Sequence, residues 1–212
     1  MNINEIFLSI QGESTFSGLP CIFVRFCNCN LNCSYCDTKY NTEINLTLDT
    51  IQLIEYIKKY HPVKLIELTG GEPLLQPDLP DLCDKLIDRG YEVLIETNGS
   101  LNLKQINHKV HKIIDVKCPD SGEGSSFLIE NLNYFKPDRD NLKFVISSLI
   151  DYEFAKNFLV KHSVSGPSVL FSGVSDRIEA KQLAEEITKD RLDVRFQLQL
   201  HKYIWDPDKR GV

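Results

Sequence analysis

The sequence lacks any apolar run that approaches the roughly 20 residues needed to cross a bilayer, which argues against a membrane-spanning helix. It also lacks an excess of positive charge, since its 212 residues carry a formal net charge of −6. No overall basic field would therefore attract nucleic acid or an anionic membrane. The first residues have neither the basic start nor the apolar core of a signal peptide. We expect a cytoplasmic protein with no nucleic-acid or membrane partner.

Internal repeats, low-complexity tracts and long linkers are also absent. The length suits one domain better than two, because single domains most often have between about 100 and 200 residues. We therefore expect a single domain over residues 1–212.

Apolar, β-branched runs alternate with helix-like segments along the chain, and this alternation predicts a parallel sheet with right-handed crossovers. Strands are predicted over 21–26, 64–69, 91–97, 112–117, 142–147, 168–171 and 193–201. Helices are predicted over 47–60, 78–89, 126–135, 150–161 and 176–189. About six strand–helix units predict an α/β fold in the form of an incomplete parallel β/α barrel. A flat, doubly wound sheet is the competing arrangement.

Polar, glycine-rich segments follow several of the predicted strands. They occupy residues 29–38, 69–73, 96–99, 115–117 and 172–173. Ligands bind at the carboxyl ends of the strands in both of these architectures. We therefore expect the segments to open onto one rim and to form a single site there.

The cysteines are odd in number, seven in all, and five of them fall within residues 21–36. Clustered thiols in a reducing compartment predict metal ligands rather than disulfides. Cys29, Cys33 and Cys36 place three thiolates on one loop. A structural zinc site normally has four protein ligands, whereas three cysteines leave one iron of a 4Fe–4S cluster open. Cys27 could supply a fourth ligand, which leaves a non-enzymatic zinc or iron–sulfur module as an alternative.

The C-x3-C-x2-C spacing resembles the signature of the radical SAM enzymes, which use S-adenosyl-L-methionine (SAM). The resemblance implies that SAM binds the open iron and that one electron cleaves it to a 5′-deoxyadenosyl radical. That radical would abstract a hydrogen atom from the substrate. The Gly-Gly-Glu-Pro segment at 70–73 and the Asp-Val-Lys segment at 115–117 resemble further SAM-binding motifs. SAM contacts are thereby implied for Tyr35, Cys36, Asp37, Gly71, Asp115, Val116 and Lys117.

Four further segments, 10–13, 23–25, 36–39 and 199–203, resemble the 7-carboxy-7-deazaguanine synthase family in their order along the chain. The resemblance implies conversion of 6-carboxy-5,6,7,8-tetrahydropterin to 7-carboxy-7-deazaguanine and ammonia, in the biosynthesis of queuosine and related 7-deazapurines. SAM would be regenerated, and Mg2+ would bind the Thr38 hydroxyl. Substrate contacts are implied for Ile10, Gln11, Gly12, Arg25, Thr69 and His201.

The same resemblance implies a radical SAM core whose N-terminal and C-terminal segments both contribute to the substrate site. It further implies a homodimer and a flavodoxin or ferredoxin as the electron donor. Residues 171–175 lack a Gln-Pro pair that the family places near SAM, and the tail 204–212 is longer than in the shortest members. Another radical SAM enzyme, such as a glycyl-radical activase, is the alternative within the superfamily.

Overall fold

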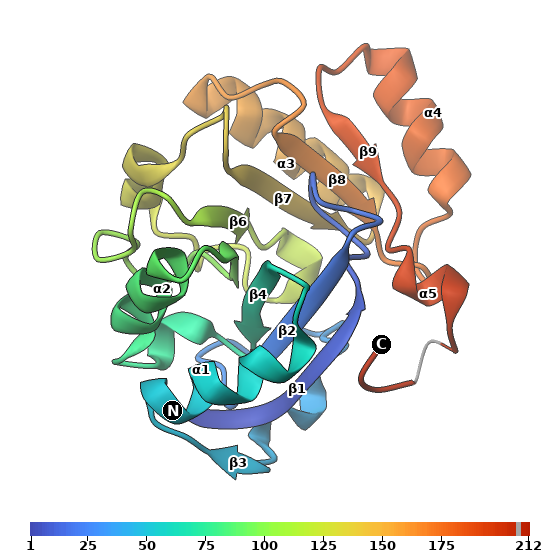
Figure 1. Ribbon diagram of the computed structural model, residues 1–212. Coiled ribbons are helices and arrows are strands. Elements are labelled where there is room, and N and C mark those ends of the chain that lie inside the picture. The colour runs from blue at the N-terminus through green and yellow to red at the C-terminus, as the bar shows by residue number, and fades with distance from the viewer. Residues whose placement is uncertain (207–208) are drawn as a thin grey trace.

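The computed structural model describes residues 1–206 and 209–212. These residues build one nine-stranded sheet with the strand order β3-β1-β2-β4-β5-β6-β7-β8-β9. The sheet curves without closing, and the four longest α-helices lie on its outer side (Figure 1). The strands are β1 Asn2–Ile10, β2 Pro20–Phe26, β3 Leu46–Thr47, β4 Leu65–Gly70, β5 Glu92–Thr97, β6 His111–Asp115, β7 Asn141–Ile146, β8 Val169–Gly173 and β9 Arg195–Gln197.

Short helices connect most of these strands. The α-helices are α1 Thr50–Ile57, α2 Leu79–Asp88, α3 Leu149–His162, α4 Ala180–Asp190 and α5 His201–Ile204. The 3-10 helices are η1 Lys39–Thr42, η2 Lys58–Tyr60, η3 Pro73–Leu75, η4 Pro119–Ser121 and η5 Ile129–Tyr134. None of the helices in the described ranges is long and apolar enough to span a bilayer.

The strand order decides between the two predicted architectures. From β2 to β9 every neighbouring pair is parallel, and from β4 onward the strands follow one another in chain order. A doubly wound sheet reverses its order at a switch point and carries helices on both faces. This sheet does neither, so the incomplete parallel barrel is confirmed and the flat alternative is wrong.

Three sequence-based expectations need correction. The antiparallel strands β1 and β3 at the N-terminal edge were not predicted. The helix expected over 126–135 is the shorter 3-10 helix η5, whose buried Asn131 side chain donates hydrogen bonds to the carbonyls of Gly99 and Leu101 and so ties the segment to the loop after β5. The strand expected over 193–201 stops at Gln197, and His201 begins α5 instead.

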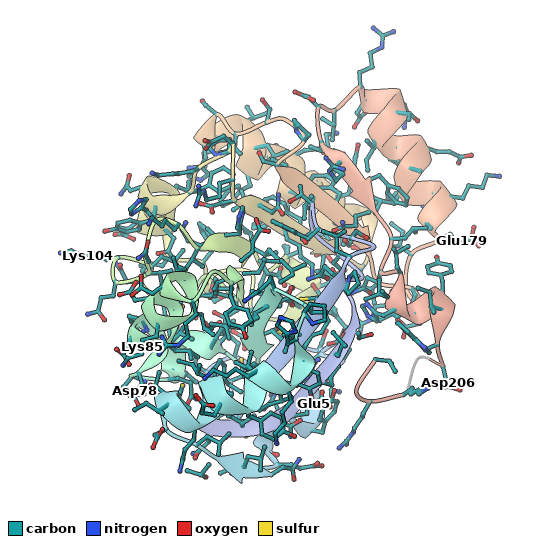
Figure 2. All side chains as sticks on the ribbon, viewed as in Figure 1. Glu5, Asp78, Lys85, Lys104, Glu179 and Asp206 are labelled. Atoms are coloured by element: carbon teal, nitrogen blue, oxygen red, sulfur yellow. The ribbon has the colours of Figure 1, made fainter. Side chains whose placement is uncertain are left out.

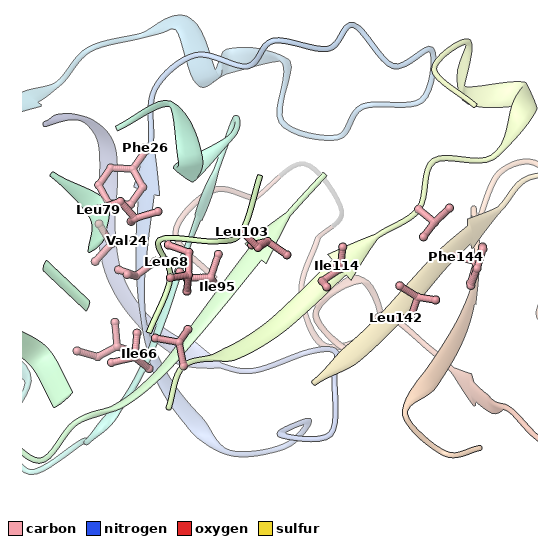
Figure 3. Packing of buried hydrophobic residues seen from close by; sticks show 14 of the residues in the cluster. Val24, Phe26, Ile66, Leu68, Leu79, Ile95, Leu103, Ile114, Leu142 and Phe144 are labelled. Carbon is pink, nitrogen blue, oxygen red and sulfur yellow. The ribbon is translucent and has the colours of Figure 1, made fainter. Parts of the chain in front are cut away.

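Alternating side chains give the sheet two different faces. Apolar side chains of the strands pack outward against α1 to α4 in one continuous cluster (Figure 3). Val24, Leu68, Ile95 and Phe144 are four of its members, and each is fully buried. The intervening side chains point to the inner face, where charged residues interrupt the apolar pattern. The fold therefore supplies a dry outer layer and an inner wall on which charged residues stand beside a second, smaller apolar cluster.

The outside of the molecule is polar and charged. Side chains such as Lys104 and Glu179 are exposed and project away from the ribbon (Figure 2). The charges on the inner wall are thus distinct from the ordinary solvated charges of the surface.

Truncation of Phe144 should show how much the outer layer stabilises the fold. The ring is fully buried between Phe158 and Phe171. Phe144→Ala should lower the free energy of unfolding in urea by roughly 3–5 kcal/mol, because it removes a large buried side chain and leaves a cavity. Val160→Ala is the control, since Val160 on α3 is 81% exposed and its loss should change stability by less than about 0.5 kcal/mol. Equal effects would contradict this description of the core.

Candidate active site at the carboxyl ends of the strands

A cavity of about 560 Å3 lies on the polar inner side of the sheet. Its wall contains every residue for which the sequence predicted a role, with the exception of Val116. These residues are Ile10, Gln11, Gly12, Arg25, Cys29, Cys33, Tyr35, Cys36, Asp37, Thr38, Thr69, Gly71, Asp115, Lys117 and His201. Segments far apart in the sequence thus meet around one space, as the rim argument predicts. The roles of the individual residues remain predictions.

The cysteine loop begins directly after β2. Cys29, Cys33 and Cys36 are partly exposed and line the cavity. Cys27 is fully buried and donates its thiol to the Glu43 carbonyl oxygen at 3.2 Å. It does not line the cavity, so the fold turns the suspected fourth ligand away from the other three. Three thiols that face one space on a single loop fit a cluster with an open iron better than a four-ligand zinc site.

The three thiols share a loop and do not form a preassembled metal cage. Within residues 1–206 and 209–212, no three His, Cys, Asp or Glu side chains converge tightly enough to hold an ion as they stand. Burial raises the pKa of Cys33 to about 11, and nearby Lys117 partly offsets that rise. Because metal binding requires deprotonated thiolates, a bound cluster would have to overcome this burial penalty. The remaining cysteines, Cys21, Cys83 and Cys118, are buried free thiols.

Two glycines allow the end of β4 to pack against the start of the cysteine loop. A Cβ on Gly71 would lie 1.9 Å from the Asn28 carbonyl oxygen, and Gly70 has a φ of +128° that favours glycine. Glu72 ties the same region to β5, since its carboxylate accepts hydrogen bonds from the Thr97 hydroxyl and from the Asn98 backbone. The Gly-Gly-Glu segment therefore fixes the position of the cysteine loop as well as lining the cavity.

Asn98 lies in the segment 96–99 that was expected on the rim, but no individual role was predicted for it. Its side-chain amide points at the Cys29 sulfur at 3.6 Å, and the Leu31 backbone N–H points at the same sulfur at 3.5 Å. Hydrogen bonds to a ligating sulfur tune the reduction potential of an iron–sulfur cluster. The Asn-Gly pair after β5 looked like an ordinary turn, so its contact with the cysteine loop becomes visible only in three dimensions.

The predicted SAM segment at 115–117 places two of its three residues on the cavity. Lys117 Nζ lies 2.6 Å from Asp115 Oδ2, and the other oxygen, Asp115 Oδ1, is buried with no hydrogen-bond partner among the described residues. An unsatisfied buried acceptor is costly unless a ligand completes it, so it fits a ligand hydroxyl such as those of a ribose. Val116 is fully buried in the core and its backbone N–H bonds the Lys143 carbonyl. Its side chain therefore does not line the cavity, and its contact with SAM stays a prediction.

The N-terminal and C-terminal segments meet at Gly12. A Cβ at this position would lie 2.5 Å from His201 Nδ1, and the Leu200 backbone N–H bonds the Gly12 carbonyl at 3.0 Å. Only glycine leaves room for the imidazole here. Burial lowers the pKa of His201, which favours a neutral ring that both donates and accepts hydrogen bonds.

Arg25 and Thr38 have protein partners as well as access to the cavity. The Arg25 guanidinium pairs with Glu5 Oε1 at 2.7 Å, which supplies the anionic partner that a half-buried arginine needs. Thr38 donates its hydroxyl to Asp37 Oδ1 at 3.0 Å. Burial acts to raise the pKa of Asp37, but Lys202 and the Thr38 hydrogen bond outweigh it and the pKa is lowered. A hydroxyl beside an ionised carboxylate forms a hard oxygen pair that suits Mg2+.

A network of charges on the inner wall contains residues for which no individual role was predicted, although Glu96 falls in the segment 96–99 that was expected on the rim. Lys143 on β7 contacts both Glu13 Oε2 at 2.5 Å and Glu96 Oε1 at 2.7 Å, while Glu67 on β4 accepts a hydrogen bond from the Gln11 side chain. All four charged residues line the cavity. Each of the three that lie on strands interrupts an apolar strand in the sequence. A charged residue inside an apolar strand needs a polar partner when buried, and this sequence signal could have identified them.

The tail contributes to the wall as well. Lys209, Gly211 and Val212 line the cavity, and Arg210 lies 3.8 Å above the Tyr40 ring. Of the segment 171–175, only Val174 lines the cavity. Pro207 and Asp208 lie outside the described residues.

Comparison with known proteins agrees with this geometry. A family model described as the radical SAM superfamily matches residues 23–117. The 7-carboxy-7-deazaguanine synthase of Koribacter versatilis (strain Ellin345) is 44% identical over 227 residues, and the match covers 100% of both chains. The synthase of the same name from Chlorobaculum tepidum is 43% identical over 215 residues, which cover 100% of this chain and 97% of the relative.

Among solved structures, QueE from Escherichia coli has a similar fold. The match has a TM-score of 0.76 and 23% sequence identity, and it covers 92% of this chain and 93% of that chain. The structural likeness supports the fold alone, whereas the full-length sequence identity shows descent. The chain belongs to the 7-carboxy-7-deazaguanine synthase family of radical SAM enzymes.

Proposed function

We propose that this protein converts 6-carboxy-5,6,7,8-tetrahydropterin to 7-carboxy-7-deazaguanine and ammonia, and so acts in the biosynthesis of queuosine or a related 7-deazapurine. The observation that carries the proposal is the shared cavity. Three thiols on one loop, the Asp37–Thr38 pair and the Gly12–His201 contact all open onto the same space. A protein that used its cysteines only for structure would need neither this cavity nor its charged wall.

When bound, a 4Fe–4S cluster and SAM supply the radical that removes a hydrogen atom from the substrate. Cys29, Cys33 and Cys36 would hold the cluster. Asp115 Oδ1 supports SAM binding as an unpartnered buried acceptor, and the Gly71 backbone would line the SAM site at the edge of the cavity. The protein's own task is to orient both molecules and to keep water away from them.

The substrate would lie between the terminal segments. Gln11 and Gly12 contribute the loop after β1, Thr69 contributes the end of β4, and His201 faces them from α5. The Thr38 hydroxyl and the Asp37 carboxylate would hold Mg2+, and the substrate carboxylate and water would complete its shell. A cation at this position would fix the substrate carboxylate and screen charge during the rearrangement.

The proposal also includes the oligomeric state and the electron donor. We propose a homodimer, and a flavodoxin or ferredoxin as the source of electrons, on the strength of the family resemblance. A metal-binding module and a glycyl-radical activase fit the structure less well. A zinc module needs a fourth ligand, and Cys27 is turned away. A glycyl-radical activase gives no reason for Gln11, Thr38 and His201 to share one cavity.

Purification without oxygen should yield a brown protein with about four irons and four sulfides per chain, because three thiols face one cavity. Iron and acid-labile sulfide analysis measures this directly, and replacing Cys33 by Ala should abolish most of the iron. Replacing Cys27 by Ala is the matched control and should leave the iron content close to that of the wild type. A colourless protein with one zinc per chain would contradict the cluster.

Turnover under anaerobic conditions tests the reaction itself. The protein with SAM, Mg2+, a chemical reductant and the carboxylated tetrahydropterin should release the deazapurine, identified by ultraviolet absorption and mass spectrometry, and an equal amount of ammonia. SAM should not be consumed in proportion to product, because it is regenerated. A cluster-loaded protein that cleaves SAM but makes no deazapurine would favour another radical SAM reaction.

Thr38→Ala tests the magnesium site. The variant should keep its iron, because no cysteine changes, yet lose most of its stimulation by Mg2+, because a hard oxygen ligand is missing. The measurement is the initial rate against Mg2+ concentration. Thr188→Ala is the control, since among the described residues that hydroxyl bonds carbonyls of its own helix α4 alone. Unchanged magnesium dependence in Thr38→Ala would remove Thr38 from the site.

A further inference from the structure

The charged group on the inner wall contains three carboxylates and one ammonium. Glu13, Glu67, Glu96 and Lys143 come from the loop after β1 and from β4, β5 and β7, and all four line the cavity. The Lys143 side chain is only 4% exposed. The proposed contacts to substrate, SAM and Mg2+ leave this group without a task.

Lys143 is shared between two of the three carboxylates. It lies 2.5 Å from Glu13 and 2.7 Å from Glu96. Burial alone would raise the pKa of Glu96, but the adjacent Lys143 outweighs it and holds that pKa below the usual range. Burial likewise opposes the charge on Lys143, yet its two carboxylate partners raise its pKa well above the ordinary value. The ammonium and the Glu96 carboxylate therefore stay charged.

Glu67 stands apart from these ion pairs. It is 3% exposed, and in the described part of the chain it accepts a hydrogen bond from Gln11 but forms no salt bridge. Burial, together with repulsion from Glu96 and Glu13, raises the pKa of Glu67 well above the usual range. It is therefore a carboxyl group that keeps its proton where an ordinary glutamate has lost it.

The proposed reaction requires an acid at this position. The ring loses a nitrogen as ammonia, and an amine departs readily only when a proton reaches it as its bond to carbon breaks. The Gln11 amide occupies Glu67 Oε2, so Oε1 is the oxygen left to carry the proton, and Glu67 lines the cavity. Gln11 thus orients the acid, and Lys143 keeps the neighbouring Glu96 ionised.

Resting on the proposed function, we propose that Glu67 is the general acid that protonates the departing amine. After ring contraction the C–N bond breaks and its electron pair moves to nitrogen. The Glu67 O–H bond breaks as the new N–H bond forms, so that ammonia leaves. A proton released from a ring carbon, as the product becomes aromatic, restores the carboxyl group. The step consumes no oxidant or reductant.

Glu67→Gln tests this assignment with the cluster-loaded enzyme and a substrate deuterated on its ring carbons. The variant keeps an oxygen that can accept the Gln11 hydrogen bond but has no acidic proton. Its kcat should fall roughly 100-fold or more with little change in KM. Deuterium should still appear in SAM, because hydrogen abstraction precedes the loss of ammonia.

The matched control is Glu55→Gln, which alters an exposed glutamate on α1 that pairs only with Lys58. It should match the wild type in iron content, kcat and deuterium transfer. Glu67→Asp is the conservative variant, which retains the acid at a shorter reach and should recover part of the lost kcat. If Glu67→Gln does not load iron, the comparison of Glu67→Asp with the wild type still decides the question.

The pH profile provides an independent readout. The groups that face Glu67 are Glu13, Cys21, Glu96 and Lys143, from the loop after β1 and from β2, β5 and β7. A general acid works only while it is protonated, so the kcat of the wild type should be constant at lower pH. It should fall as the pH rises through the elevated pKa of Glu67. The residual kcat of Glu67→Gln should lack this fall.

Three results would overturn the assignment. A kcat of Glu67→Gln within about threefold of the wild type would show that no proton transfer was lost. A rise in KM alone would assign Glu67 to substrate recognition. Loss of deuterium transfer in an iron-loaded variant would place Glu67 before hydrogen abstraction. If the wild-type protein itself makes no deazapurine, the proposed function fails, which is a separate outcome from any of these.

Discussion

The buried ammonium of Lys143 is the interaction on which the inner wall of the sheet depends. Two strands and the loop after β1 bring carboxylates toward the same space, and like charges that lie close together repel strongly in a medium of low polarity. Lys143 contacts both Glu13 and Glu96 and offsets the repulsion between their carboxylates. Removing it would leave uncompensated buried charge, which is far more destabilising than the loss of a surface ion pair.

The outer face of the sheet is apolar and packs against helices. Apolar side chains at alternate strand positions meet the apolar stripes of α1 to α4, and together they form one cluster. The outer layer allows the inner face to carry polar groups, because stability comes mainly from the other side of the sheet. The cavity is therefore a consequence of strand periodicity, with charged residues at inward positions such as Arg25 and Glu67.

Sequence patterns predicted the parallel strands well, because buried strands bounded by glycine and helices with period 3.6 leave strong local signals. They did not predict β1 and β3, whose pairing is antiparallel and depends on contacts with β2. The cysteine loop was visible as a local motif. Asn98 and Lys143 were not, since neither residue type nor spacing reveals that Asn98 reaches Cys29 or that Lys143 bridges two carboxylates. Long-range contacts of this kind appear only once the strand order is known.

The contact between Gly12 and His201 affects how the cavity would open when the protein unfolds locally. The thiols of the cluster loop lie within eight residues of one another in sequence, whereas Gly12 and His201 lie near opposite ends of the chain. His201 follows β9, a strand of three residues at the edge of the sheet, and short edge elements open at low free energy. Fraying of β9 and α5 would separate His201 from Gly12 while the cysteine loop kept its contacts with β4 and β5. The part of the cavity at Gly12 and His201 would thus open more easily than the part at the cysteine loop.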